Sequence, residues 1–191
     1  MVGGNLGYPS LLGYEYDVPS SCLLINLKDA TVSEKSHMND PRCYHGLAHV
    51  NNFIYAVAGN DDLDEDRRSC ERYEIGEDRW CLLPGRANFD EFAKYVSIVV
   101  AQKRHIMVFG GMNFQGDLAD SSLIRSLDHL QPKKGWRVLN VVNPQHAKCV
   151  YGQGVFSLGS GGELLVFGGS DEYDEYRKTQ ISKQFTSMPT S

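Results

Sequence analysis

The 191-residue sequence has little positive charge and no long hydrophobic run. Its 19 lysines and arginines are outnumbered by 24 aspartates and glutamates, which gives a formal net charge of −5. Because nucleic acids and anionic membrane surfaces attract a basic protein face, this balance argues against both as main partners. No apolar stretch approaches the roughly 20 residues that a membrane-spanning helix needs. We therefore expect no nucleic-acid binding and no membrane insertion.

Paired cysteines are also missing. The five cysteines are widely spaced and form no C-x-x-C pair, so neither a disulfide framework nor a zinc site is expected. The sequence contains no N-x-S or N-x-T glycosylation signal either. This usage favours free thiols in a reducing compartment, and we expect a cytoplasmic protein.

The short patterns that mark common active sites are absent from the sequence. It contains no G-x-S-x-G turn, no H-E-x-x-H zinc motif and no P-loop. The glycine-rich segment 159–162 lies between two apolar runs rather than before a helix, so it is expected to be a hairpin turn and not a phosphate cradle. We therefore predict no catalytic residues, no metal site, no cofactor and no enzymatic activity.

What the sequence does contain is a repeat of similar segments. Each segment is a β-rich apolar run that ends in small residues, at 53–60, 105–112 and 163–170. When Gly59, Gly111 and Gly169 are matched, the intervals are 52 and 58 residues, and Val2-Gly3-Gly4 matches the end of a further copy. A regular period in the fifties is typical of an array of β units.

Each unit has the same internal order. A second apolar run precedes each glycine segment, at 44–50, 95–101 and 149–156, and a tight turn joins the two runs at 51–52, 102–104 and 159–162. Such turns between β-rich runs predict hairpins. A polar loop, a shorter run and a final run that begins at Trp80 or Trp136 follow, with Val32 and Phe185 in the tryptophan place of the first and last units. We therefore expect four antiparallel strands in a complete unit.

Four strands, with glycines after the second and an aromatic residue on the fourth, resemble the kelch repeat of β-propellers. The resemblance covers nearly the whole chain and is most specific in the second unit, although the double glycine there is Ala58-Gly59. It implies an all-β fold, a kelch-type β-propeller segment made of four-stranded antiparallel blades. It also implies structural roles for the repeated glycines and aromatic residues, namely Gly59, Tyr73, Trp80, Gly110, Gly111, Trp136, Gly168 and Gly169.

The repeat boundaries divide the chain into blades. We expect one kelch propeller segment over 1–191, with a partial blade at 1–41 and blades at 42–91, 92–146 and 147–191. Residues 21–35 supply only the outer two strands of the first blade. Because closed propellers use about four to eight blades and open edges are costly, we expect a longer chain or a larger complex to complete the ring. Closure by two copies of the chain is the less favoured alternative.

Two loops that follow a glycine segment are strongly acidic. The loop at 60–68 alternates acids like a calcium loop, but Arg67 and Tyr73 replace the glycine and glutamate that such a loop needs, so a solvated acidic loop or a partner-binding loop is favoured over a metal site. Strand alternation places the loops of successive blades on one face. We predict a partner with a basic or mixed-charge surface, bound by Asp61, Asp62, Asp64, Glu65, Asp66, Arg67, Asn113, Phe114, Asp171, Glu172, Tyr173 and Tyr176.

We predict a protein-interaction or scaffold module. Kelch relatives commonly serve as ubiquitin-ligase adaptors or cytoskeletal components, and the resemblance implies such a setting here by analogy alone. The alternative is an enzyme built on a propeller, of the oxidase or sugar-isomerase type. The only partial cluster for it is Tyr44, His45, His49 and Tyr95, and a pair of histidines without further ligands is more often packed than bound to metal.

Overall fold

The computed structural model describes residues 6–10, 13–60, 68–89, 94–113, 123–140, 152–159 and 162–169. These residues form antiparallel β-sheets and two short 3-10 turns, η1 (Gly85–Ala87) and η2 (Pro132–Lys134), with no α-helix among them. No helix in the same ranges has the length and apolar character needed to cross a membrane. The fold of these residues is all-β and includes four-stranded antiparallel sheets, as expected for propeller blades.

Two of the sheets have four strands in chain order. The first contains β5 (Gly46–Val50), β6 (Phe53–Val57), β7 (Cys70–Glu74) and β8 (Arg79–Leu82). The second contains β9 (Ser97–Ala101), β10 (His105–Phe109), β11 (Leu123–Asp128) and β12 (Arg137–Asn140). Each is a simple meander, in which every strand pairs with its neighbours in sequence, and the turns at 51–52 and 102–104 close the first hairpin of each sheet.

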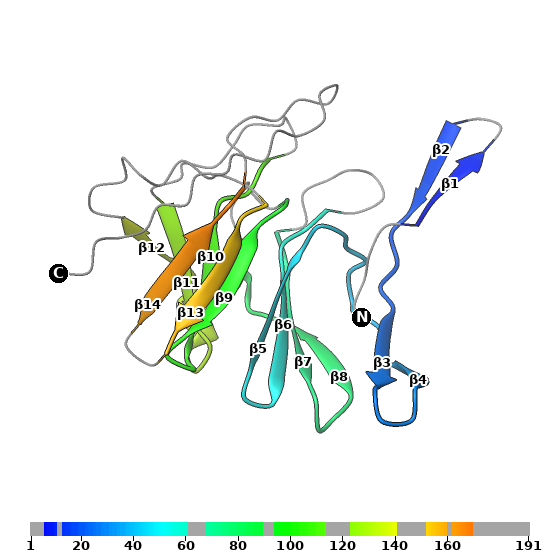
Figure 1. Ribbon diagram of the computed structural model, residues 1–191, viewed down its shortest axis with the longest axis horizontal. Helices are drawn as coiled ribbons and strands as arrows, with labels where there is room; N and C mark the ends of the chain where they lie inside the picture. The colour runs from blue at the N-terminus through cyan, green and yellow to red at the C-terminus, as the bar shows by residue number, and fades with distance from the viewer. Residues whose placement is uncertain are drawn as a thin grey trace.

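The remaining strands form three two-stranded sheets. They are β1 (Leu6–Ser10) with β2 (Gly13–Asp17), β3 (Cys22–Asn26) with β4 (Thr31–Lys35), and β13 (Gly154–Leu158) with β14 (Glu163–Phe167). Four groups of strands stand side by side in chain order, namely β3–β4, β5–β8, β9–β12 and β13–β14, so that β3–β4 lies at one end and β13–β14 at the other (Figure 1). The hairpin β1–β2 stands apart, beyond β3–β4.

Alternation along each strand gives each sheet two distinct faces. On β5, Gly46, Ala48 and Val50 are buried whereas Leu47 and His49 are exposed. The pairing Gly46↔Val57 and Val50↔Phe53 places the partners on the same face. Each sheet can therefore pack against a neighbour on both sides, as the blades of a propeller do.

Three apolar clusters fill the spaces between the sheets, which we call seams. The seam between β3–β4 and β5–β8 holds Cys22, Met38, Ala56, Tyr73 and Trp80. The seam between β5–β8 and β9–β12 is the largest and includes Tyr55, Val57, Ile106, Val108, Leu127 and the half-buried Trp136. The seam between β9–β12 and β13–β14 holds Met107 and Phe109, with Val155 and Leu164 packed against them. Every seam joins strands far apart in sequence.

The glycine segments end their strands with a repeated backbone turn. The first position has a positive φ in each unit, 60° at Ala58, 61° at Gly110 and 68° at Gly168. The second position is more extreme, with φ of 102° at Gly59. A Cβ at Gly59 would lie 2.6 Å from the Cys43 carbonyl oxygen, so only glycine fits there. At the first position Ala58 adopts the left-handed backbone, at a cost of roughly 1–2 kcal/mol relative to glycine.

The strands differ from the sequence expectation in two places. The inner strands begin at Gly46 and Ser97 rather than at 44 and 95, because Tyr44 and Tyr95 have positive φ values of 54° and 55° that interrupt an extended chain. The hairpin β1–β2 was not expected from the sequence. It forms its own sheet and does not supply inner strands to β3–β4.

Candidate protein-interaction face

The loops that follow β6 and β10 leave the sheets at one common end, which we call the loop end. An isolated bridge pairs Cys43 with Asn60 just after β6, and a second pairs Lys94 with Met112 just after β10. Each bridge has two backbone hydrogen bonds of 2.9–3.0 Å. The two bridges fix the chain that enters each blade against the loop that leaves its second strand. The base of the loop end is thus built in the same way in both blades.

A buried ion pair holds the first of these loops in place. Arg42 and Glu71 have fully buried side chains, and a guanidinium nitrogen lies 2.8 Å from a Glu71 carboxylate oxygen. Glu71 also accepts hydrogen bonds from the backbone N–H groups of Asn39 and Asp40. Arg42 donates to the carbonyl oxygens of Ala58 and Ser69. One pair thereby ties strand β7, the connection 39–42 and both ends of the loop 60–69 together.

In the next blade, a different arginine stabilises the equivalent carbonyl group, that of Gly110. Arg125 on β11 holds the place that Glu71 holds on β7, and its guanidinium donates to the Gly110 carbonyl, as Arg42 does to Ala58. Arg125 also lies over the ring of Phe89, 5.6 Å from the ring centre. Because a buried charge needs several partners, these contacts fix the exit from β10. Arginine therefore caps the first glycine position in both complete blades.

The inner edge of the loop end is aromatic. The rings of Tyr44 and Tyr95 lie 4.6 Å apart between centres, and the Tyr95 N–H donates to the Tyr44 carbonyl oxygen. The Gly152 N–H in turn donates to the carbonyl oxygen of Tyr95, at 3.5 Å. The three residues have similar positive φ values at the same repeat position. They form a ladder that links successive blades at their inner strands.

The two histidines of the partial cluster lie in different environments. Both ring nitrogens of His45 are buried without a hydrogen-bond partner, and burial, with the nearby charge of Arg42, lowers the pKa of His45 to about 4. His49 is exposed on β5. His45 is therefore neutral near pH 7 and is not paired with His49. Within the described ranges, no group of three or more His, Cys, Asp or Glu side chains is placed to hold a metal ion.

Most of the predicted partner-binding residues lie outside the described residues. These are Asp61, Asp62, Asp64, Glu65, Asp66, Arg67, Phe114, Asp171, Glu172, Tyr173 and Tyr176. Asn113 is described, and its side chain is buried rather than presented to solvent. The structure therefore describes the base of the loop end and not the loops themselves.

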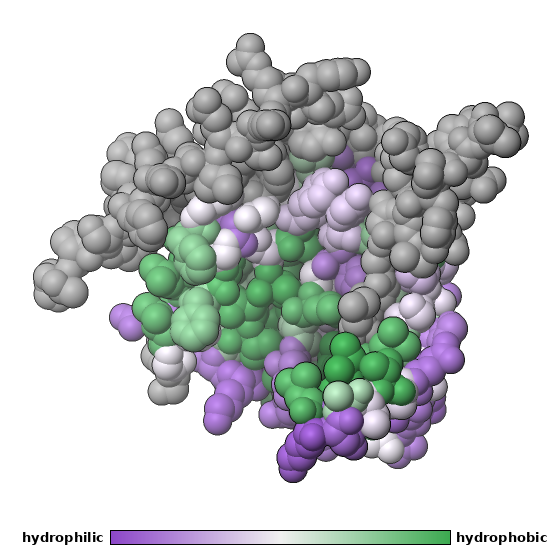
Figure 2. Space-filling model, turned by 45° about the vertical axis from the view of Figure 1, so that its right-hand side comes forward, coloured by the Kyte–Doolittle hydropathy of each residue, from purple (hydrophilic) through white to green (hydrophobic). Residues whose placement is uncertain are grey.

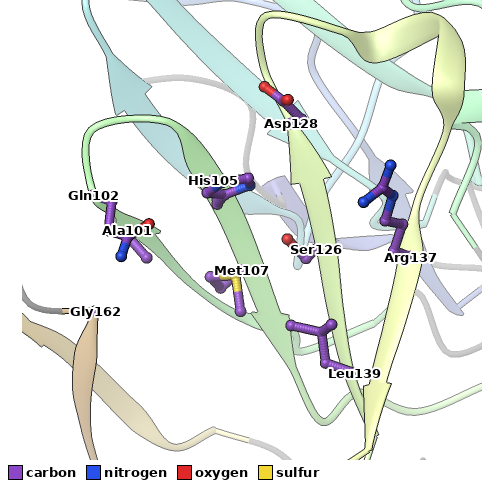
Figure 3. Close-up of a pocket in the computed structure, with 9 residues that line it drawn as sticks. All are labelled: Ala101, Gln102, His105, Met107, Ser126, Asp128, Arg137, Leu139 and Gly162. Carbon is purple, nitrogen blue, oxygen red and sulfur yellow. The ribbon is translucent and has the colours of Figure 1, made fainter.

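The structure also contains a pocket that sequence reasoning missed. It has a volume of about 280 Å³ and lies beside β10, β11 and β12, facing the β13–β14 turn (Figure 3). Its lining consists of Ala101, Gln102, His105, Met107, Ser126, Asp128, Arg137, Leu139 and Gly162. The one signal in the sequence that could have indicated this pocket is the alternation of residues along β10 and β11. This alternation places the lining residues of both strands on one face of the sheet.

Comparison with known proteins agrees with the repeat and the blade geometry. A family model described as Kelch motif matches residues 41–85, which contain β5–β8. The kelch repeat and BTB domain-containing protein 2 of cowpox virus (strain Brighton Red) is 29% identical over 118 residues, which are 61% of this chain and 20% of that relative. Residues 41–85 thus match the kelch motif, and the chain is similar to kelch-repeat proteins.

Other kelch-repeat relatives bear the same description. The ectromelia virus (strain Moscow) protein is 33% identical over 87 residues, which are 46% of this chain and 15% of the relative. The horsepox virus protein is 27% identical over 121 residues, or 61% of this chain and 21% of the relative. The chain thus spans about a fifth of the length of the curated relatives that it matches.

Proposed function

We propose that this kelch-repeat chain is a protein-interaction module that binds a basic or mixed-charge partner through the loop end. The observation that carries the proposal is the rigid base of that end, where the Arg42–Glu71 ion pair and the two bridges anchor the loop at 60–69 and the exit from β10. A rigid base holds exposed loops in a fixed arrangement and lowers the entropy that binding costs. We place the protein in the cytoplasm, where its buried free thiols remain reduced.

The chemistry of the loops suggests the partner. Asp61, Asp62, Asp64, Glu65 and Asp66 follow Asn60 in sequence, and the corresponding segment after Gly169 holds Asp171 and Glu172. Two acidic loops at the same end of two blades attract a basic surface, and such attraction weakens as salt screens it. The relatives are named for kelch repeats and BTB domains, which fits a role in protein assembly.

The test reverses the charge of the loops. A variant with Asp61, Asp62, Asp171 and Glu172 changed to lysine should lose a subset of the proteins that co-purify with the wild-type chain, as measured by quantitative mass spectrometry. The same subset should be lost from the wild type when the salt concentration is raised. Melting temperature should stay unchanged, because the variant keeps the buried Arg42–Glu71 pair.

A matched control separates position from net charge. Changing Asp61 and Asp62 to lysine alters the net charge as much as changing Asp29 and Glu77, two exposed acids in the turns at the opposite end of the sheets. Only the first pair should reduce partner recovery. Equal recovery by the two double variants and the wild type would remove the loop end as the binding face.

A further inference from the structure

Two short turns from different blades meet in a group of basic residues, which we call the basic corner. Turn η1 follows β8, turn η2 lies between β11 and β12, and the two turns are in contact. Each has basic residues in its last positions, Arg86 in η1 and Lys133 and Lys134 in η2, and all three side chains are exposed. We propose that the basic corner is a docking site for an acidic protein segment.

The backbone fixes the two turns against each other. Gly135 ends η2 with a φ of 76°, and a Cβ there would lie 3.5 Å from the Cβ of Arg86 and closer still to the Arg86 carbonyl oxygen. Only glycine therefore allows this approach. The indole N–H of Trp136 donates to the Ala87 carbonyl oxygen at 2.8 Å, and its ring lies edge-on to that of Phe89. Because the corner is already held in one arrangement, binding there costs little backbone entropy.

Charge on the described surface gathers in the turns rather than on the faces of the sheets. Figure 2 shows apolar residues over the middle of the side that it presents and hydrophilic residues along the lower edge, where hairpin turns lie. The turn that holds η2 carries charge of one sign, since residues 129–137 include lysines and an arginine but no acid. The acid that precedes this turn, Asp128, is held by Arg104 at 2.6 Å.

The cations of the basic corner differ from other cations on the sheets in their partners. Arg72 and Arg79 both pair with Glu74, at 2.6 and 3.0 Å. Within the described ranges, the three cations of the basic corner form no ion pair. A paired cation must release its own carboxylate before it can bind another, whereas an unpaired one is ready to accept it. The corner is therefore suited to an incoming carboxylate.

The size of the corner favours an acidic protein segment over other polyanions. Proteins that bind nucleic acid contact about 6–10 phosphates, and polybasic membrane anchors use about four to eight lysines or arginines. The basic corner has fewer cations than either, and the chain around it has a net charge of −5, which repels an extended polyanion. A short peptide segment with a few carboxylates can pair with all of the cations and avoid the rest of the surface.

Cross-linking of an oligoglutamate peptide tests where such a segment binds. A carbodiimide condenses a carboxylate with a lysine amine to an amide only when the two groups are in contact. Lys133 and Lys134 should be joined to the peptide, as mass spectrometry can locate. Lys28 and Lys103 are exposed lysines in other turns and should not be joined. Equal yields at all four lysines, or no cross-link at Lys133 and Lys134, would overturn the proposal.

Charge reversal measures the contribution of the corner to affinity. Changing Lys133 and Lys134 to glutamate should weaken binding of the labelled peptide at least about tenfold in fluorescence anisotropy, because attraction becomes repulsion. Changing Lys28 and Lys103 to glutamate alters the net charge equally and should weaken binding less than about threefold. All four side chains are exposed, so both variants should stay folded by circular dichroism. Equal affinities of the two double variants would contradict the assignment.

A single change tests whether both turns take part. Arg86→Glu should weaken peptide binding at least about threefold, whereas Arg79→Glu, which changes a guanidinium already paired with Glu74, should not. Tighter binding of single-stranded DNA or of phosphatidylserine vesicles than of the peptide would overturn the choice of ligand. The variant with reversed acidic loops should bind the peptide at least as tightly as the wild type. Failure of this proposal and failure of the loop-end proposal are therefore distinguishable.

Discussion

At the scale of single residues, Gly59 is the position that tolerates substitution least. Its φ of 102° and the 2.6 Å approach of the Cys43 carbonyl oxygen mean that Gly59→Ala must displace backbone. We expect a loss of at least about 3 kcal/mol in the free energy of unfolding. Gly76→Ala is the control, because a Cβ at Gly76 meets nothing within 4 Å, and it should change stability by less than about 0.5 kcal/mol. Urea denaturation measures both, and equal midpoints would contradict the assignment.

His45 provides a second residue-scale prediction, on pH. Its pKa is about 4 in the folded chain against an ordinary 6.5, so the unfolded chain binds a proton that the folded chain does not between these values. Stability is therefore fully present above pH 6.5 and should fall by up to about 3 kcal/mol as the pH drops to 4. Burial lowers the pKa of His129 as well, which adds to the same trend.

The His45→Phe variant isolates the contribution of His45. Its loss of stability between pH 6.5 and 4 should be smaller than that of the wild type, as measured by urea denaturation across this range. Asp128 has its pKa lowered by Arg104, so its contribution is lost only at lower pH and does not interfere. A pH dependence that matched the wild type would show that His45 is protonated without cost in the folded chain.

At the scale of the strands, the Arg42–Glu71 pair joins elements that are separate in sequence. Glu71→Ala leaves the buried Arg42 guanidinium with only the more distant Asp40 carboxylate, 3.6 Å away, and we expect a loss of about 3–5 kcal/mol. Arg104→Met removes an exposed partner of Asp128 and should cost no more than about 1 kcal/mol. Thermal or urea unfolding compares the two. Similar losses would mean that the buried network does not hold the loop end.

The two tryptophans give an element-scale test of the seams. Truncation to alanine at either Trp80 or Trp136 should cost about 3–5 kcal/mol, because each packs in a seam between blades. Phenylalanine separates them. The Trp136 indole N–H donates to the Ala87 carbonyl oxygen, whereas that of Trp80 has no partner. Trp136→Phe should therefore cost about 1 kcal/mol more than Trp80→Phe in urea denaturation, and the reverse order would contradict this.

Sequence reasoning succeeded where the signal was local and periodic. The strands β5–β8 follow from alternation and the Asn51-Asn52 turn, which restrict pairing to neighbours. It did not predict the positive φ of Tyr44, because neighbouring blades rather than residue preference impose it. Nor did it predict the Arg42–Glu71 pair, whose partners are 29 residues apart and meet only in the folded chain. The acidic loops stay a prediction.

At the scale of the whole molecule, stability should decline from the centre of the array to its ends. Strands β6 and β10 are paired along both edges. Their side chains Tyr55, Val57, Ile106 and Val108 are fully buried. The pairs β3–β4 and β13–β14 have only one described partner per strand and exposed apolar side chains. Since repeat arrays gain stability from neighbouring interfaces, the central strands should open last.

Amide hydrogen exchange measures this gradient strand by strand. In dilute protein, β6 and β10 should exchange slowest and β13–β14 fastest, because the terminal pair has a single seam to stabilise it. Uniform protection across all strands at low concentration would instead indicate a single cooperative unit that needs no neighbour at either end.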